Sequence, residues 1–331
     1  MKISEAKAVR LRRLATDKGV IAALAIDQRK SLRMMIAAAA GVDTEAISHQ
    51  QLLEFKSAVT RILTSHASAV LIDSEFGADA FADRAHSCGL LTTYEMDGYE
   101  NPRPHRMLAL LPELSVRRLR EMGSDGIKIL LSYTPYDDAA WNDHKLAMIE
   151  RIGAECEAND MPFFLEPVGY DVSGADVKGF EYAKRKPDIV LRTIEELSKD
   201  MYKVDVLKVE FPVNAEYVEG SSVYAGRTAY TREQALEWYR RVDTVAQRPY
   251  IYLSAGVGAS QFREQLLLSA ESGSRFSGVL CGRATWQDGV PVYAKQGGEA
   301  LERWLSEQGV ANIQVVNDCL RSARPWHAWV D

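Results

Sequence analysis

Short apolar runs alternate with longer segments of helical period along this chain. That alternation is typical of strand–helix–strand units built around a parallel sheet. We expect eight strands, at residues 21–27, 69–75, 89–95, 126–133, 162–171, 204–212, 250–257 and 278–284. Eight parallel strands predict an α/β fold of the (β/α)8 TIM-barrel class.

Helix signals fall between the strands. Apolar residues at three- and four-residue steps predict a helix over 47–67. Thr231 and Gln234 form a capping-box pattern that opens a helix over 231–242, and another helix begins near Ser260. Three segments exceed a minimal barrel, namely an N-terminal helix at 4–15, an extra helix at 186–197 and a C-terminal helix pair within 299–331.

Composition sets the broad class of the protein. Of 331 residues, 47% are hydrophobic and 26% charged, which is ordinary for a globular chain. No repeat and no Pro/Gly/Ser-rich linker divides it, so we expect residues 1–331 to form a single domain. A net charge of −6 would repel a polyanion, so nucleic acid is not an expected partner. No apolar run is long enough for a membrane span.

Cysteine and histidine usage bears on compartment and cofactors. The four cysteines show no CxxC spacing and the start of the chain lacks a secretory signal, which together predict the reducing cytoplasm. The six histidines are dispersed and form no HExxH pattern. We therefore expect no metal and no other cofactor. The aromatic C-terminal tail is compatible with a homo-oligomer, and equally with a tail that folds back on its own chain.

Polar residues gather where the predicted strands end, which is where a TIM barrel places its active site. Asp27, Gln28 and Arg29 follow the first strand, and such side chains can bond hydroxyls or phosphate. Asp73 and Glu75 follow the second strand, where ordinary ion pairing at the rim is the expected role. Packing of loops or the tail is the expected role of three tryptophans, Trp286, Trp326 and Trp329.

Charged residues inside apolar strands are the most informative feature. Lys128, Glu166 and Lys208 lie within the fourth, fifth and sixth strands, where a lone ammonium would be costly to desolvate. If all three face inward, they share one cavity. Desolvation and the neighbouring cation of Lys128 would then favour the neutral amine of Lys208, which can attack a ketone, and Glu166 could carry protons. A structural triad of buried ion pairs is the alternative.

A phosphate-binding pattern occurs at the last two strands. Ser254 and Gly256 precede a helix, and Gly282 lies beside Arg283. Backbone amides at a helix N-terminus can cradle a phosphate there, while a guanidinium donates paired hydrogen bonds. The glycines can also be simple turn residues. Together, at adjacent strand ends, these residues favour a phosphorylated small molecule as substrate.

Several long blocks keep a common order from about residue 20 to the tail. They read LAIDQR, GSDGIKILL, ERIGAEC, MPFFLE, VDVLKVEFPVN, YVEG, PYIYLSAGV and GVLCGRATW. These blocks closely resemble the tagatose 1,6-bisphosphate aldolase family of class I aldolases. The resemblance implies a TIM barrel without a metal requirement, and reversible cleavage of a ketohexose 1,6-bisphosphate to dihydroxyacetone phosphate and glyceraldehyde 3-phosphate.

The resemblance also implies roles for single residues. The lysine of LKVE that forms the Schiff base is Lys208, the glutamate of FFLE that transfers protons is Glu166, and the lysine of the GIK segment is Lys128. The positions that match the family's substrate and phosphate contacts are Asp27, Gln28, Ser254, Gly282 and Arg283. Lys128, Glu166 and Lys208 are also charged residues that lie inside predicted apolar strands.

Two segments depart from the family's usual wording. PVGYD follows FFLE, and SYTPYDD follows KILL; both lie at strand ends that could touch the distal half of the sugar. Relatives of this family split 6-deoxy-6-sulfofructose 1-phosphate, whose distal group is a sulfonate, so this ketose is the alternative substrate. A sugar-phosphate-binding barrel without turnover, and a metal-dependent lyase on the same fold, are the competing hypotheses.

Overall fold

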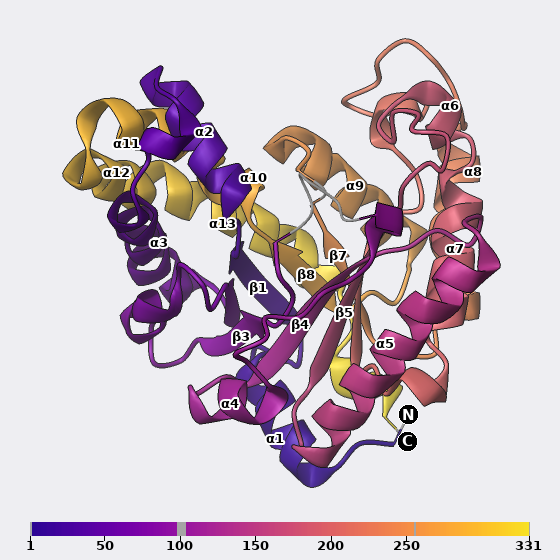
Figure 1. Ribbon diagram of the computed structural model, residues 1–331. Helices are drawn as coiled ribbons and strands as arrows, with labels where there is room; N and C mark the ends of the chain where they lie inside the picture. Colours follow the sequence, from indigo (N-terminus) through magenta and orange to yellow (C-terminus); the bar gives the residue numbers. More distant parts are fainter. Residues whose placement is uncertain (1, 98–103, 255, 331) are drawn as a thin grey trace.

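The computed structural model describes residues 2–97, 104–254 and 256–330. Its strands form one closed barrel in which each strand runs parallel to the next and the eighth pairs with the first. Figure 1 shows this barrel inside a ring of helices. The predicted TIM barrel is therefore confirmed. The strands are β1 (Ile21–Ile26), β2 (Ala69–Ile72), β3 (Gly89–Thr93), β4 (Gly126–Ser132), β5 (Phe163–Val168), β6 (Val206–Val209), β7 (Tyr250–Leu253) and β8 (Gly278–Cys281).

Helices fill the connections between the strands. Ser48 caps α3 and Thr231 caps α8, and in each case the glutamine three residues on completes a capping box. The helices are α1 (Glu5–Arg13), α2 (Lys30–Ala40), α3 (His49–Leu63), α4 (Val116–Glu121), α5 (Ala139–Ala158), α6 (Phe180–Ala183), α7 (Lys186–Leu197), α8 (Arg232–Val245), α9 (Ala259–Ser272), α10 (Arg283–Trp286), α11 (Val290–Gln296), α12 (Gly298–Trp304) and α13 (Val310–Asp318).

Two apolar layers lie between the barrel and its helices. One packs β1, β2 and β3 against α2, α3, α11 and α12, which Figure 1 shows on the left of the barrel. The other packs the outer faces of β4 to β8 against helices that include α5, α7, α8 and α9. Because successive strand residues point to opposite faces, the residues between these outward ones face the barrel interior.

The lower end of the barrel interior is closed by apolar side chains. The inward residues of this layer include Ala23, Leu91, Phe164, Val206 and Ile251, and they pack with Leu14 and Trp326 from outside the barrel. The backbone N–H of Trp326 donates to the carbonyl of Gly19 at 2.9 Å, so the C-terminal tail folds back here. Figure 1 draws both chain ends at this end of the barrel.

Most element boundaries differ from the sequence prediction by a few residues. The helices predicted at 186–197 and 231–242 are α7 and α8, while the helix predicted over 47–67 is the shorter α3. The strand predicted over 250–257 ends at Leu253, because the chain turns into α9; its Ala255 lies outside the described residues.

The C-terminal prediction was wrong in form. Instead of a helix pair, α12 continues through a π-helical turn at Leu305–Gly309 into α13. Gly309 keeps a helical φ of −61° there, so it does not reverse the chain. Among residues 2–97, 104–254 and 256–330, no helix is long and apolar enough to cross a membrane.

The tryptophans have the packing roles that the sequence analysis expected. Trp286 is fully buried and donates its indole N–H to the carbonyl of Ala25 at 2.9 Å. Trp326 closes the lower end of the barrel, and Trp329 contacts the ring of Tyr250.

Candidate functional site

A cavity opens at the carboxyl ends of the strands, above the apolar layer. Its wall contains the strand residues Lys128, Glu166 and Lys208, together with Asp27 after β1 and Glu95 after β3. In β5 and β6 the inward side chain two residues earlier belongs to the apolar layer. The period-two pattern of the strands thus brings the three predicted strand charges into one cavity.

Glu166 connects the two lysines. Its Oε1 lies 2.7 Å from the Nζ of Lys208, and its Oε2 lies 3.0 Å from the Nζ of Lys128. All three side chains are less than a tenth exposed. A single carboxylate can therefore exchange a proton with Lys208 through one oxygen while the other oxygen stays bound to a second cation.

Lys128 is surrounded by acids. Its Nζ lies 2.9 Å from Asp27 Oδ2, 2.9 Å from Glu95 Oε1 and 3.0 Å from Glu166 Oε2. Burial by itself would lower the pKa of Lys128, but Asp27, Glu166 and Glu95 outweigh burial and raise this pKa well above its ordinary value. Lys128 is therefore a fixed cation at the centre of the cluster.

The same interactions keep two of the acids ionised. Burial would raise the pKa of Asp27 and of Glu166, but the charges of Lys128 and Lys208 outweigh it. The pKa of Asp27 falls well below its usual range, and that of Glu166 is also lowered. The three strand charges thus form buried ion pairs, as a purely structural role would require. These ion pairs also line an open cavity, which a purely structural role would not require.

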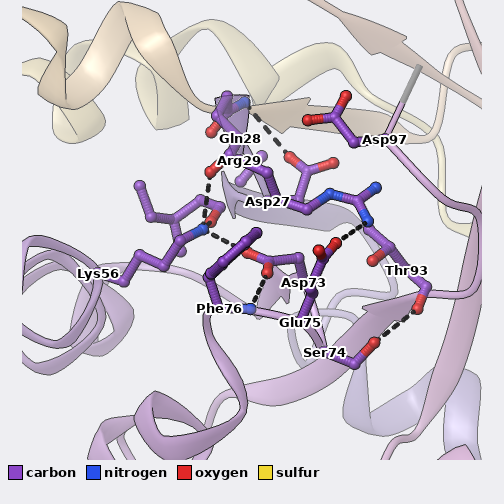
Figure 2. Close-up of polar contacts among 12 residues, drawn as sticks. Asp27, Gln28, Arg29, Lys56, Asp73, Ser74, Glu75, Phe76, Thr93 and Asp97 are labelled. Atoms are coloured by element: carbon purple, nitrogen blue, oxygen red, sulfur yellow. Dashed lines mark hydrogen bonds and ion pairs between the residues drawn. The ribbon is translucent and has the colours of Figure 1, made fainter. Parts of the chain in front are cut away.

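The segment that follows β1 is anchored by a lysine that the sequence analysis missed. Lys56 of α3 is fully buried and donates to the carbonyls of Ile26 at 2.7 Å and Gln28 at 2.8 Å, and to the carboxylate of Asp73. Figure 2 shows Lys56 to the left of Asp27, with its bond to Asp73. The signal in the sequence is weak, because a lysine at a helix position usually faces solvent.

Arg29 is held by neighbours. It donates to Glu75 Oε2 at 3.2 Å and to the carbonyl of Glu95 at 3.0 Å, as Figure 2 shows for the first bond. Burial would lower its pKa, but Glu95, Asp73, Asp97 and Glu75 outweigh burial and raise it. The predicted ion pairs of Asp73 and Glu75 are confirmed, although Asp73 is fully buried rather than at an exposed rim.

Apart from Glu166 Oε2, which forms the ion pair with Lys128, two buried acceptor atoms in the cavity wall have no hydrogen-bond partner among the described residues. They are Oε1 of Gln28 and Oε2 of Glu95. Gln28 uses its amide N–H to donate to Asp27 Oδ1 at 3.3 Å, which leaves its oxygen free. Because an unpaired buried acceptor is costly, both atoms are suited to bind hydroxyl groups of a ligand.

The residues of the predicted phosphate site also meet. An added Cβ on Gly256 would lie 2.5 Å from Nη2 of Arg283, and the φ of Gly256 is +68°. An added Cβ on Gly282 would lie 2.6 Å from the carbonyl oxygen of Ala25. A glycine is thus favoured at 256 by the positive φ and at 282 by the close backbone of Ala25. Ser254, Gly282 and Arg283 line the cavity.

Other cavity residues were missed as site residues. Glu95 follows β3 and binds Lys128, and nothing in the local sequence around it indicates this contact. Asp97 and Arg106 lie between β3 and α4 in a segment without a periodic pattern, and both line the cavity. Among the described residues, no group of three or more His, Cys, Asp or Glu is arranged to hold a metal ion.

The fold and the cavity define a class: a (β/α)8 barrel whose strand ends bring two lysines and three carboxylates into one cavity. The profile of the DeoC/LacD family aldolases matches residues 21–288. The chain is 46% identical to a tagatose 1,6-diphosphate aldolase of Listeria monocytogenes over 98% of this chain and 95% of the relative. It is 45% identical to tagatose 1,6-diphosphate aldolase 1 of Enterococcus faecalis over 97% of each.

The chain therefore belongs to the DeoC/LacD aldolase family, and the resemblance seen in the sequence is confirmed. A solved structure of fructose-bisphosphate aldolase from Plasmodium falciparum shares the fold. It aligns with a TM-score of 0.67 over 96% of each chain, at 12% sequence identity.

Proposed function

We propose that this chain is a Schiff-base aldolase that cleaves tagatose 1,6-bisphosphate to dihydroxyacetone phosphate and glyceraldehyde 3-phosphate. The observation that carries the proposal is the carboxylate of Glu166, which contacts Lys208 with one oxygen and Lys128 with the other at the floor of the cavity. The names of the curated relatives support tagatose 1,6-bisphosphate as the substrate.

In the proposed reaction, Lys208 first gives a proton to Glu166, and its amine attacks carbon 2 of the open-chain ketose. Glu166 returns this proton to the carbinol oxygen and then carries a second proton from the nitrogen to the same oxygen, so that water leaves and a protonated imine forms. The carbon-4 hydroxyl then loses its proton to Glu166. The bond between carbons 3 and 4 breaks, its electron pair enters the imine, and glyceraldehyde 3-phosphate departs. Protonation of the enamine carbon and addition of water release dihydroxyacetone phosphate and the free lysine.

Lys128 and Asp27 have electrostatic roles in this scheme. Lys128 is held as a cation by three carboxylates, so it favours the ionised form of Glu166 between proton transfers. Asp27 stays ionised and stabilises the positive charge that develops on the imine. Gln28 Oε1 is placed to accept a hydrogen bond from a sugar hydroxyl.

One phosphate is assigned to the end of the cavity near β7 and β8. Gly256 lets the backbone approach the guanidinium of Arg283, and Ser254 and Gly282 complete this part of the wall. Arg29 also lines the cavity, and its role as a substrate contact stays a prediction. We place the carbon-1 phosphate at Arg283, because dihydroxyacetone phosphate then remains bound while the imine is hydrolysed.

The proposal is tested with a panel of ketose phosphates and a coupled assay for triose phosphate. The panel contains tagatose 1,6-bisphosphate, fructose 1,6-bisphosphate and 6-deoxy-6-sulfofructose 1-phosphate. Highest kcat/KM with tagatose 1,6-bisphosphate supports the proposal, whereas comparable values for both bisphosphates would show weak discrimination at carbon 4. Preference for the sulfonate would move the assignment to that substrate. Binding of all three without triose phosphate release would contradict the aldolase function.

The cellular setting belongs to the same proposal. All four cysteines are free and buried, which supports a reducing compartment such as the cytoplasm. The expected partner is the sugar phosphate itself, and a homo-oligomer stays a prediction.

A further inference from the structure

A second guanidinium faces the cavity at a place that the reaction scheme does not use. Arg106 lines the cavity wall from the segment between β3 and α4, and its guanidinium lies 4.7 Å from the centre of the Tyr170 ring. Tyr170 follows β5. Arg106 follows β3, so its contact with Tyr170 lies near the end of β4, the strand between β3 and β5. In the closed barrel β4 and β8 lie on opposite sides, so this contact is across the mouth from Arg283, which follows β8.

Arg106 differs from most other cations of the cavity in having no carboxylate in contact with it among the described residues. Among the described residues, three of the cavity cations, Arg29, Lys128 and Lys208, have a carboxylate within 4 Å. Arg106 and Arg283 also line the cavity, and no described carboxylate lies within that distance of either guanidinium. A guanidinium without an acid in a ligand cavity is available for an anion of the ligand. A ketose with an anionic group at each end needs two such positions.

The backbone at Arg106 has an uncommon conformation. His105 and Arg106 both have a φ of +53°, in the left-handed region that side-chain-bearing residues rarely adopt. Such conformations persist where surrounding structure holds them, and they are concentrated at ligand clamps. The strained turn directs the guanidinium onto Tyr170 and into the cavity wall.

Tyr170 is itself held in place by buried partners. Its hydroxyl receives a hydrogen bond from Lys145 Nζ at 2.7 Å and donates one to the carboxylate of Asp137. Lys145 is fully buried and also lies 3.2 Å from Asp137. Asp137 and Tyr170 belong to SYTPYDD and PVGYD, the two segments that depart from the family's usual wording. The fold therefore joins both segments into a support for Arg106.

Local electrostatics favour an anion at this place. Burial lowers the pKa of Lys145, and repulsion from Arg106 lowers it further, while Asp137 opposes both effects. A bound anion beside Arg106 would relieve the repulsion between these two cations. The surroundings of Arg29 are the opposite, because Glu75, Glu95 and Asp97 already supply negative charge there. A dianion would be repelled from that side of the mouth.

We propose that Arg106 binds the distal anionic group of the ketose phosphate, at the end opposite the phosphate held by Arg283. This assignment rests on the proposed aldolase function and adds to it a residue that sets substrate specificity. The shared chemistry of the distal group is a tetrahedral oxyanion, either a phosphate or a sulfonate. Arg106 would make the aldolase prefer ketoses that carry an anion at both ends.

The test compares substrates with and without the distal anion. The kcat/KM of Arg106→Ala is measured with tagatose 1,6-bisphosphate and with tagatose 1-phosphate, and 6-deoxy-6-sulfofructose 1-phosphate forms a third arm. We expect a loss of about 30-fold or more with the bisphosphate and little change with the monophosphate, because a charge-assisted contact is removed only from the former. A similar loss with the sulfonate would extend the site to that group; loss with only one doubly anionic substrate identifies the group it binds.

Two further variants separate binding from folding. Arg106→Asn keeps a residue that tolerates positive φ, so it should reproduce the selective loss without disturbing the turn. Arg283→Ala should lower kcat/KM with every substrate, since all carry the carbon-1 phosphate. Arg33→Ala serves as the matched control. Arg33 belongs to α2, its guanidinium lies over the ring of Phe76, and it is not part of the cavity wall. Its activities should stay at wild-type values.

Distinct outcomes bear on the two proposals. If the wild-type protein cleaves both tagatose phosphates but Arg106→Ala and Arg106→Asn lose activity equally on both, or on neither, the distal-anion assignment is wrong while the aldolase function stands. If the wild-type protein releases no triose phosphate from any substrate, the function itself is wrong and the assignment fails with it.

Discussion

The two ends of the barrel interior differ sharply over a distance of two residues. On β5 the inward side chain of Phe164 belongs to the apolar layer, and that of Glu166 binds both lysines of the cavity. On β6 the same change occurs between Val206 and Lys208. Two residues of strand correspond to about 6.6 Å. One step of the pleat thus separates a packed core from the charged cavity.

This difference shows how the barrel supports its chemistry. The apolar layer excludes water beneath the cavity, so charges at its upper surface interact strongly and must be paired. Lys128 and Lys208 meet that requirement through shared contact with Glu166. At the opposite end of the strands, Lys7 pairs with Asp205 at 2.7 Å, away from the cavity wall. A buried ion pair of a lysine and a carboxylate therefore occurs at both ends, and of these two described pairs only the pair of Lys208 and Glu166 lines the cavity.

The largest expected effect comes from Lys208→Met. The variant loses the amine that forms the imine, so kcat should fall by about 10⁴-fold or more, while the protein remains folded. Steady-state kinetics with tagatose 1,6-bisphosphate measures the loss. Lys7→Met is the matched control at the other end: it should lower the melting temperature but leave kcat of the folded enzyme near the wild-type value. Equal kinetic losses in both variants would remove the distinction between the ends.

A smaller kinetic effect is expected from Glu166→Gln. The amide keeps the shape of the side chain but cannot accept the proton of Lys208, so kcat should fall by about 10² to 10⁴-fold. The acidic limb of the kcat profile that depends on the ionised carboxylate should disappear as well. Because the pKa of Glu166 is lowered from 4.5, this limb lies at acidic pH, and a profile measured from pH 7 down to 3.5 tests its loss. An unchanged acidic limb would assign the proton transfer to another group.

Lys128→Met should act mainly on stability. Removing the central cation leaves Asp27, Glu95 and Glu166 with less compensation, at a cost of about 3–5 kcal/mol at pH 7. The native pKa values of Asp27 and Glu166 should rise above their lowered wild-type positions. Urea unfolding across pH measures the cost.

The sign of the pH dependence follows from these pKa shifts. In the wild type, the lowered native pKa values of Asp27 and Glu166 stabilise the fold above their unfolded values of about 4, and this contribution is lost as pH falls below them. In Lys128→Met the raising effect of burial is no longer outweighed, so the native pKa values of these carboxylates should rise above their unfolded values. Its unfolding free energy should therefore increase as pH falls from 7 toward 5, whereas a steady decrease would contradict the assigned role of Lys128.

The smallest effect is expected from Phe164→Leu in the apolar layer. A smaller side chain in a close-packed position should lower the unfolding free energy by about 1–2 kcal/mol. Because Phe164 lies one pleat below Glu166, the catalytic geometry should change little. Chemical unfolding and kcat are measured on the same preparation. A loss of kcat comparable to that of Glu166→Gln would show that the two layers are not separable.

Much of the fold could be predicted because its signals are local. Apolar runs identified all eight strands, and charged residues inside three of them identified Lys128, Glu166 and Lys208. Glu210 lies two residues after Lys208, so strand alternation alone would place its side chain in the cavity as well. β6 ends at Val209, and Glu210 instead contacts Lys186 at 3.2 Å on the outer side.

Other site residues could not be found from local patterns. Lys56 extends from α3 to the carbonyls of Ile26 and Gln28. Its burial depends on how α3 packs against β1, which the sequence of the helix does not reveal. Arg106 lies in a segment without periodicity, and the chain passes through two strands, β4 and β5, before it reaches its contact at Tyr170. Such contacts between distant segments appear only when the barrel closes.

The most direct test of the central claim is borohydride trapping with dihydroxyacetone phosphate, followed by peptide mass spectrometry. If Lys208 forms the imine, reduction should leave one stable adduct on the peptide that contains Lys208, with loss of activity in proportion, and Lys208→Met should remain unlabelled. Absence of an adduct, or an adduct on Lys128 in place of Lys208, would contradict the account.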